Sequence, residues 1–92
     1  MEFEWDEAKA ASNLLKHGVR FDQAIDAFAD PDALEVIDAR ADYGEERVIL
    51  IGQATPGVLL VVYTERGVKT RIISARKASK HERSHYYRQK TQ

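Results

Sequence analysis

Hydrophobic positions in the first third of the chain recur at the spacing of helices. Between Asp6 and His17, alanine and leucine form one stripe, and Gly18 follows. Aspartate is a common helix N-cap, and glycine commonly follows the last helical residue. From Phe21 to Phe28, apolar residues fall at i, i+3, i+4 and i+7, which is the pattern of an amphipathic helix. The pattern therefore predicts two N-terminal helices.

After Pro31 the pattern changes from a helical period to that of strands. Leu34–Ile37 is a short apolar run, and longer runs rich in β-branched residues follow at 47–52, 58–64 and 68–75. Short segments containing glycine or proline separate the longer runs, and these residues favour tight turns. Strands joined by such short links form an antiparallel meander. We therefore expect an antiparallel sheet of three to four strands.

The last segment of the chain begins with a helix-start signal. Ser79-Lys80-His81-Glu82 has the spacing of a capping box, in which serine and glutamate side chains bond to each other's backbone N–H groups. A C-terminal helix is expected from Ser79 to about Lys90. The 92 residues make a single domain spanning 1–92. The predicted fold class is α+β: two N-terminal helices, an antiparallel meander and a C-terminal helix.

Composition favours a protein of a reducing compartment. The chain contains no cysteine, which excludes disulfides and thiolate zinc sites. Its acidic start, MEFEWDEAK, lacks the basic and apolar regions of a signal peptide. The longest apolar run, Val58–Tyr63, is far too short to span a bilayer. We therefore expect a soluble cytoplasmic protein that does not enter a membrane.

The net charge of −1 conceals a division of the chain into a longer acidic part and a shorter basic part. Residues 1–65 hold five Lys/Arg against fourteen Asp/Glu, and residues 66–92 hold nine Lys/Arg against Glu82 alone. The balances are 5 − 14 = −9 and 9 − 1 = +8. Such asymmetry indicates that the last third meets an anionic partner. Neutralisation of one half by the other across the fold is the alternative interpretation.

The segment HERSH, His81–His85, matches the zinc-protease pattern H-E-x-x-H. A catalytic zinc site needs a third protein ligand, and no His, Cys, Asp or Glu follows His85. The surrounding residues are strongly cationic, which repels a divalent ion. The capping box already accounts for Glu82. We therefore interpret the motif as a coincidence and expect no metal and no other cofactor.

The chain contains the residue types that metal-independent cleavage of RNA requires, several of them in the basic third. Such cleavage needs a base for the 2′-hydroxyl, an acid for the leaving 5′-oxygen, cations for the transition-state phosphate and aromatic rings for the bases. Arginine fits the phosphate because its planar fork matches two oxygens. Residues of these types stand at Lys16, His17, Arg47, Arg66, Arg71, Arg76, Tyr86 and Tyr87.

Several of these residues have a purely structural explanation as well. Lys16 and His17 precede Gly18, where a helix C-terminus favours positive charge on dipole grounds alone. Arg47 and Arg71 open strands, where an exposed charge protects a sheet edge from aggregation. For these positions the sequence leaves the structural and the catalytic interpretation open.

Arg76 is harder to explain structurally because it stands between the last strand and the C-terminal helix. Alternation along RIISAR puts it on the face of Ile72 and Ser74, opposite Arg71 and Ala75. One of these faces must pack on the helices, and the alternation does not say which. We expect guanidinium groups gathered beside this strand to form a pocket for the scissile phosphate.

Several blocks of the chain resemble the BrnT family of toxins from type II toxin–antitoxin pairs. The blocks are FEWDEAKAASNLLKHGVRF, EERVILIG, LLVVYTERG and RIISARKASKHER with the tyrosine pair after it, and together they extend from Phe3 to Tyr87. The resemblance implies a RelE-like fold and a ribonuclease activity that stops translation and arrests growth. It also implies a cognate antitoxin whose DNA-binding domain lets the complex repress its own promoter.

The resemblance strengthens a catalytic interpretation of particular positions. We expect Arg76, aided by Arg47, to stabilise the transition-state phosphate, and His17 or Lys16 to move a proton. Tyr86 is a second candidate for proton transfer or stacking. The residues expected to hold the RNA backbone are Arg66, Arg71, Lys77, Lys80 and Arg83.

A non-catalytic interaction module is the alternative hypothesis. In that case the basic third docks an acidic partner or nucleic acid, and no bond is broken. Intact RNA and normal growth after induction of the gene alone would favour this alternative.

Overall fold

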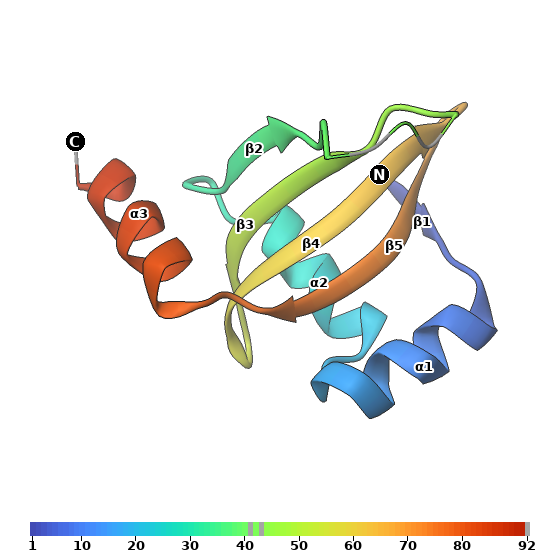
Figure 1. Cartoon of the computed structure of the whole chain (residues 1–92), viewed down its shortest axis with the longest axis horizontal. Coiled ribbons are helices and arrows are strands. Elements are labelled where there is room, and N and C mark those ends of the chain that lie inside the picture. The colour runs from blue at the N-terminus through green and yellow to red at the C-terminus, as the bar shows by residue number, and fades with distance from the viewer. Residues whose placement is uncertain (41, 43, 92) are drawn as a thin grey trace.

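The computed structural model describes residues 1–40, 42 and 44–91 (Figure 1). Its elements, in chain order, are β1 (Glu2–Glu4), α1 (Glu7–His17), α2 (Phe21–Phe28), β2 (Leu34–Ile37), β3 (Val48–Ala54), β4 (Gly57–Arg66), β5 (Lys69–Lys77) and α3 (Lys80–Lys90). The three predicted helices and the four predicted strands are present, so the α+β class is confirmed. Within the described residues, no helix combines the length and the apolar character needed to cross a bilayer.

The sheet differs from the predicted antiparallel meander of three to four strands. It has five strands in the order β1-β5-β4-β3-β2. β2, β3, β4 and β5 form the expected antiparallel meander, but β1 adds a parallel pair, with Glu2 opposite Lys69 and Glu4 opposite Arg71. No strand was predicted here because the segment EFE is short and acidic and its partner strand lies near the other end of the chain.

The helix ends are fixed by the caps expected from the sequence. The Asp6 carboxylate accepts hydrogen bonds from the backbone N–H groups of Ala8 and Lys9 at 2.8 and 3.1 Å. Gly18 closes α1 with a φ of 68°, a conformation that glycine adopts without steric cost. The capping box of α3 is confirmed as well, since Glu82 accepts from Ser79 N–H at 2.8 Å and Ser79 Oγ accepts from Glu82 N–H at 3.2 Å.

The core lies between one face of the sheet and the helices α1 and α2. Its buried residues include Val19, Phe21, Ala24, Ala27, Leu50, Leu59, Val61, Tyr63, Ile72 and Ala75. At Gly52 the backbone of α2 comes so near that an added Cβ would lie 2.7 Å from the Ala27 carbonyl oxygen. Close contact between α2 and β3 therefore requires glycine at this position.

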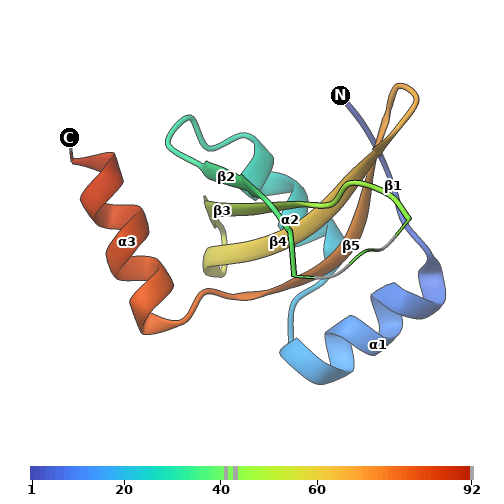
Figure 2. The same cartoon turned by 45° about the horizontal axis from the view of Figure 1, so that its top comes forward.

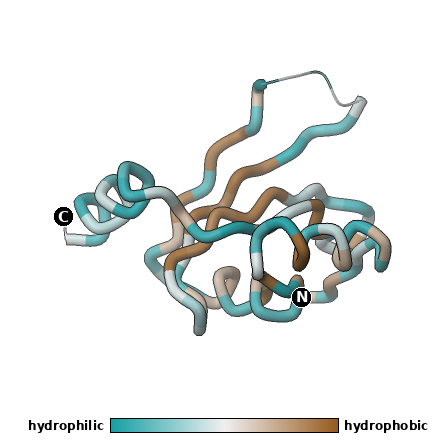
Figure 3. Tube along the Cα trace, turned by 60° about the horizontal axis from the view of Figure 1, so that its bottom comes forward, coloured by the Kyte–Doolittle hydropathy of each residue, from teal (hydrophilic) through white to brown (hydrophobic). Residues whose placement is uncertain are grey.

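The C-terminal helix stands apart from this core. In Figures 1 and 2, α3 lies beyond the end of the sheet, far from α1. Figure 3 shows that α3 is mostly hydrophilic, whereas hydrophobic residues concentrate in the strands. A second small apolar cluster of Val58, Ala78 and Tyr86, with Leu34 and Ile51 against it, joins α3 to the sheet.

A β-bulge changes which residues of β5 share a face. The register between β4 and β5 shifts between Val62 and Tyr63, so Ser74 lies opposite Val62 and Ile72 opposite Tyr63. Simple alternation placed Ile72 with Ser74 and Arg76, and this prediction was wrong, because a bulge inserts an extra residue into one strand. Ile72 faces the helices, while Ser74 and Arg76 lie on the other face, which we call the second face.

Candidate active site

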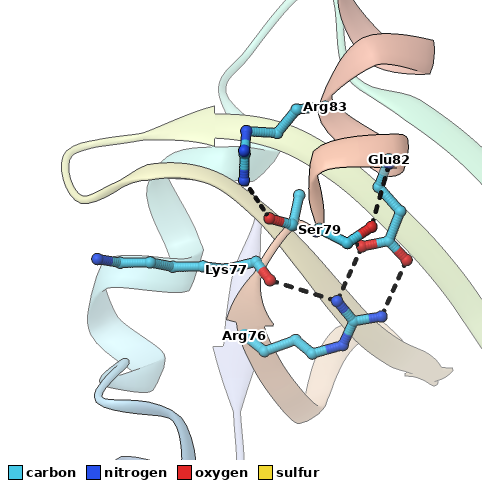
Figure 4. A network of polar contacts seen from close by, with 6 residues as sticks. Arg76, Lys77, Ser79, Glu82 and Arg83 are labelled. Atoms are coloured by element: carbon cyan, nitrogen blue, oxygen red, sulfur yellow. Dashed lines mark hydrogen bonds and ion pairs between the residues drawn. The ribbon is translucent and has the colours of Figure 1, made fainter.

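A bidentate contact with a carboxylate holds Arg76 at the junction between β5 and α3. Its Nη1 donates to Glu82 Oε1 at 2.8 Å, and its Nη2 donates to Glu82 Oε2 at 2.9 Å (Figure 4). Nη1 also donates to the Lys77 carbonyl oxygen at 3.3 Å. Because Glu82 also caps α3 at Ser79, one carboxylate fixes both the arginine and the start of the helix.

The contact with Glu82 leaves part of the guanidinium open. Arginine has five N–H donors, and the three hydrogen bonds of Arg76 in the described part of the chain use only Nη1 and Nη2. The Nε–H and one N–H of Nη2 remain, and these two form a second parallel fork of the kind that binds phosphate oxygens. The Arg76 side chain is 37% exposed, and none of its hydrogen bonds in the described part of the chain uses this fork as a pair.

The ion pair shifts the pKa of both partners. Hydrogen bonding from Arg76 is the main reason that the pKa of Glu82 falls from 4.5 to about 2, against the opposing effect of burial. The same hydrogen bonding raises the pKa of Arg76. Both groups are therefore charged at neutral pH, and Arg76 acts as a fixed cation rather than a proton donor.

A polar hollow lies between α1 and β5. It has a volume of about 180 Å³ and is lined by Lys9, Ser12, Asn13, Lys16, His17, Ile73 and Ser74. The helix places Lys9, Lys16 and His17 at i, i+7 and i+8, which is one face of α1. Lys16 and His17, both predicted from the sequence, therefore share this hollow with Lys9 and Ser12, which the sequence analysis did not single out.

Asn13 positions α1 against the edge of β5. β1 pairs with β5 only as far as Arg71. Beyond this point, the Asn13 side-chain amide forms hydrogen bonds with the edge of β5 that a neighbouring strand would otherwise form. Its Oδ1 accepts from Ala75 N–H at 3.1 Å, and its Nδ2 donates to the carbonyl oxygens of Ala75 and Val19 at 2.7 and 3.0 Å. A buried asparagine bonded to two distant backbone segments fixes the distance from α1 to β5. The only feature of the sequence that indicates this role is the polar residue type of Asn13 within a helix of mostly apolar and charged residues.

The cations of this hollow differ from most others in the chain. No ion pair joins Lys9, Lys16 or His17 to a carboxylate among the residues that the structure describes. The positive charge of Lys9 and Lys16 is therefore available to an anion. Ser74 lines the hollow and shares the second face with Arg76, two residues further along β5, which corresponds to about 7 Å along a strand. Ser74 is thus the residue that connects the lining of the hollow to the strand position of Arg76.

Three of the predicted arginines lie at the opposite end of the sheet. Arg66 and Arg47 approach Glu45 at 3.4 and 3.5 Å, and Arg71 contacts Glu4 at 3.1 Å. Their strand positions put them near the β4–β5 turn, whereas Arg76 pairs with Leu60 near the other end of β4. These strand positions do not place the three arginines beside Arg76 along the sheet, and the assistance of Arg76 by Arg47 stays a prediction.

The basic residues around the junction point in different directions. Figure 4 shows the Lys77 side chain extending away from Arg76 and Glu82. Arg83 lies on the other side of the turn, where its Nη1 donates to the Ala78 carbonyl oxygen at 2.8 Å. Lys80 is exposed at the first position of α3. These three residues surround the junction without forming one cluster with Arg76.

Tyr86 is buried rather than exposed to a substrate. Its exposed fraction is 0%, and its hydroxyl donates to Asp30 Oδ2. Burial and this hydrogen bond raise the pKa of Tyr86. Burial alone would raise the pKa of Asp30, but hydrogen bonds from Gln53 N–H and Tyr86 lower it overall. In this structure Tyr86 anchors α3 to the sheet, and Tyr87, 46% exposed, packs edge-on against it.

Arg40 is a further cation near Arg76 that the sequence analysis missed. Its charge lowers the pKa of Arg76 against the larger effect of Glu82, which places the two groups within electrostatic range. A bidentate contact orients Arg40, with Nε and Nη2 donating to the buried Asp38 carboxylate at 2.7 and 2.8 Å. The residue lies in the connection between β2 and β3, where no periodic pattern marks it.

The fold and the site together define a small α+β protein that presents fixed cations to an anionic ligand. A sequence model of the ribonuclease toxin BrnT of type II toxin–antitoxin systems matches residues 5–82, and the chain therefore belongs to this family. No curated protein matches the chain. The resemblance noted in the sequence is thus confirmed, and the family implies an RNA substrate and an antitoxin partner.

Proposed function

We propose that this protein is a metal-independent endoribonuclease toxin with a RelE-like fold, acting in the cytoplasm. It cuts RNA, stops translation and arrests growth until a cognate antitoxin neutralises it. The observation that carries the proposal is the second fork of Arg76, two residues along β5 from Ser74, which lines a hollow together with Lys9, Lys16 and His17. Lys9 and Lys16 have no carboxylate partner in the described part of the chain. Family membership supplies the substrate class.

The chemistry of such a site follows from its geometry. The 2′-oxygen attacks the adjacent phosphorus, and His17 or Lys16, acting in its uncharged form, takes its proton. The Nε–H and Nη2–H fork of Arg76 donates to the phosphate oxygens and stabilises the additional negative charge of the transition state. The bond to the 5′-oxygen breaks, and this oxygen takes up a proton, so the products are a 2′,3′-cyclic phosphate and a 5′-hydroxyl.

Glu82 is a positioning residue in this scheme. It holds two donors of Arg76 and thereby fixes the orientation of the guanidinium, whose Nε–Nη2 edge it does not occupy. A substrate phosphate does not have to displace the carboxylate, because it binds the other edge of the guanidinium. The scheme therefore accounts for an arginine that is both ion-paired and catalytic.

The remaining basic residues contact the RNA backbone on either side of the scissile phosphate. Lys77, Lys80 and Arg83 surround the β5–α3 junction and serve the nearer nucleotides. Arg66 and Arg71 lie at the far end of the sheet and are paired with carboxylates, so their contribution to RNA binding is smaller. Arg47 belongs with these two rather than with Arg76.

The antitoxin is proposed to carry a DNA-binding domain and to form a hetero-oligomer with the toxin. The complex represses its own promoter through that domain. Inhibition follows when the antitoxin neutralises the same cations that attract RNA.

Cleavage of RNA by purified protein in the presence of EDTA tests the proposal. Wild type is expected to cut, and Arg76→Ala is expected to lose activity by about 10²–10³-fold, the usual effect of removing a transition-state donor. Arg88→Ala is the matched control, because Arg88 is an exposed arginine in the last turn of α3. Equal rates for Arg76→Ala and wild type would contradict the site assignment.

A non-catalytic interaction module is the second candidate, and the Arg76–Glu82 ion pair favours it. Two of the arginine's nitrogens are already engaged by Glu82, as in a purely structural junction. Induction of the gene without antitoxin separates the two functions. Normal growth with intact total RNA would support the module and contradict the ribonuclease.

A further inference from the structure

The outward surface of α1 carries no charge. Ala8, Ala11, Ser12 and Leu15 fall on one side of the helix, all are exposed, and Leu15 is 89% exposed. Surface helices usually place charged and polar residues on this side. A single exposed leucine is common, but here alanines at i−4 and i−7 extend the apolar area along the helix.

This apolar ridge continues into a groove on one flank of α1. The groove has a volume of about 290 Å³, and its lining is apolar at Trp5, Ala10, Ala11, Leu14 and Phe21 and charged at Glu7, Arg20 and Asp22. The Trp5 and Phe21 rings meet edge to face at 5.9 Å, and Trp5 Nε1 donates to Glu7 at 3.0 Å. Hydrogen bonding satisfies the indole N–H, so its ring presents an apolar wall that suits a large aliphatic or aromatic side chain.

The other flank of α1 carries the cationic hollow. Positions 7, 10, 11 and 14 of the helix line the groove, whereas positions 9, 12, 13, 16 and 17 line the hollow. The ridge of Ala8, Ala11 and Leu15 separates the two. A ligand that crosses α1 therefore meets, in order, an apolar groove, an uncharged ridge and a group of cations.

We propose that a segment of the cognate antitoxin crosses α1 and occupies all three features. It inserts one large apolar side chain into the groove lined by Trp5 and Phe21, lays small or apolar residues over Leu15, and places Asp or Glu against Lys9 and Lys16. The surface complements an amphipathic segment with one apolar and one acidic side. By covering the hollow, this segment blocks the RNA site. The proposal rests on membership in a toxin–antitoxin family, and its effect on cleavage rests on the proposed function.

The charges on α1 argue against two other occupants. A second copy of this chain, docked through the same surface by a two-fold axis, would bring the cations of one hollow toward those of the other. RNA would bind the cations, but its phosphates would gain nothing from the apolar groove and ridge. An acidic amphipathic polypeptide uses every part of the surface.

Two substitutions and a matched control test the proposal. The measurement is the affinity of each purified full-length toxin variant for the purified antitoxin, determined by calorimetry. Leu15→Arg and Ala11→Arg place a charged, bulky side chain on the ridge and at the groove, and arginine keeps a high helix propensity. Each is expected to weaken antitoxin binding at least tenfold. Val68→Arg, at an 82% exposed apolar residue in the β4–β5 turn, is expected to bind as wild type does.

The outcomes separate this proposal from the ribonuclease assignment. Leu15→Arg is expected to remain toxic and to cut RNA in the absence of antitoxin, because it touches neither Arg76 nor the hollow. Wild-type binding by both α1 variants would overturn the docking proposal, whatever the RNA assay shows. A toxin dimer that Leu15→Arg dissociates would overturn it too, since the surface would then serve self-association. Absence of cleavage by wild type would overturn only the ribonuclease assignment.

Discussion

At the scale of single residues, the central feature is an arginine that is shared between a structural and a chemical role. Glu82 takes two of the Arg76 nitrogens, at 2.8 and 2.9 Å, and the other edge of the guanidinium stays open. Only a planar group with five donors provides two such edges. A lysine at this position would carry the same charge but a single point of contact. Geometry, rather than charge alone, therefore explains the choice of arginine.

Arg76→Lys tests this explanation. The variant keeps the positive charge but has no second fork, so cleavage is expected to fall about 10²-fold, close to the loss for Arg76→Ala. Cleavage rates for wild type, Arg76→Lys and Arg76→Ala under identical conditions provide the measurement. A lysine variant that restores most of the activity would show that charge alone suffices.

Glu82→Gln tests the ion pair through the pH dependence of stability. The pKa of Glu82 is lowered from 4.5 to about 2, so the pair stabilises the fold above about pH 4.5 and loses this effect as the pH falls toward 2. Wild type is expected to exceed Glu82→Gln by about 1 kcal/mol in unfolding free energy at pH 7, because the pair is partly exposed to solvent. The difference should shrink between pH 4.5 and 2 in denaturant titrations, and a constant difference over this range would contradict the pairing.

At the scale of elements, α3 depends on a few specific contacts. It is hydrophilic along most of its length, and among its own residues only Tyr86 is buried. A helix with so little apolar surface gains little from burial, so the capping box, the Arg76–Glu82 pair and the Tyr86–Asp30 hydrogen bond hold it in place. The position of α3 therefore determines the position of the Arg76 fork.

Tyr86→Phe distinguishes an anchor from a catalytic group. Loss of the hydroxyl removes the bond to Asp30 but keeps the buried ring, so the unfolding free energy is expected to fall by about 1–2 kcal/mol. Cleavage of RNA is expected to stay within about threefold of wild type. If the variant is as stable as wild type and cuts RNA hundreds of times more slowly, Tyr86 moves a proton after all.

At the scale of the whole molecule, much of the charge asymmetry is neutralised within the fold. Cations of the last third contact acids of the first two thirds in the pairs Arg66–Glu45, Lys69–Glu4, Arg71–Glu4 and Lys90–Asp32. The interpretation that one part of the chain neutralises the other is therefore partly confirmed, and an anionic partner for the last third stays a prediction. Among the described residues, Lys77, Lys80, Arg83 and Arg88 of the last third have no carboxylate partner, and neither do Lys9 and Lys16 of the hollow.

The salt dependence of RNA binding follows from this distribution. If the three or four cations of the site make the main phosphate contacts, the slope of log K against log salt should be about −2 to −3, at about 0.7 per contact for single strands. All nine Lys/Arg of residues 66–92 would give about −6. Titrations with a 2′-O-methyl RNA, which is not cleaved, provide the slope, and a value near −6 would contradict the proposed site.

The sequence predicted the elements better than the site, for physical reasons. Caps and hydrophobic periods are local, so the helices and the main strands could be located from neighbouring residues. The parallel pairing of β1, the bulge at Val62 and the Asn13 contacts depend on segments far apart in the chain. For the same reason, Lys16 and His17 could be identified as candidate residues from the sequence. Their proximity to Lys9 and their separation from Arg47 could not be predicted from it.

End-group analysis of RNA fragments produced in EDTA tests the central claim most directly. Attack by the 2′-oxygen, assisted only by side chains of this protein, predicts fragments with a 2′,3′-cyclic phosphate and a 5′-hydroxyl, and no cleavage where the 2′-hydroxyl is replaced by hydrogen. Fragments with a 3′-hydroxyl and a 5′-phosphate, or activity that EDTA abolishes, would contradict the account.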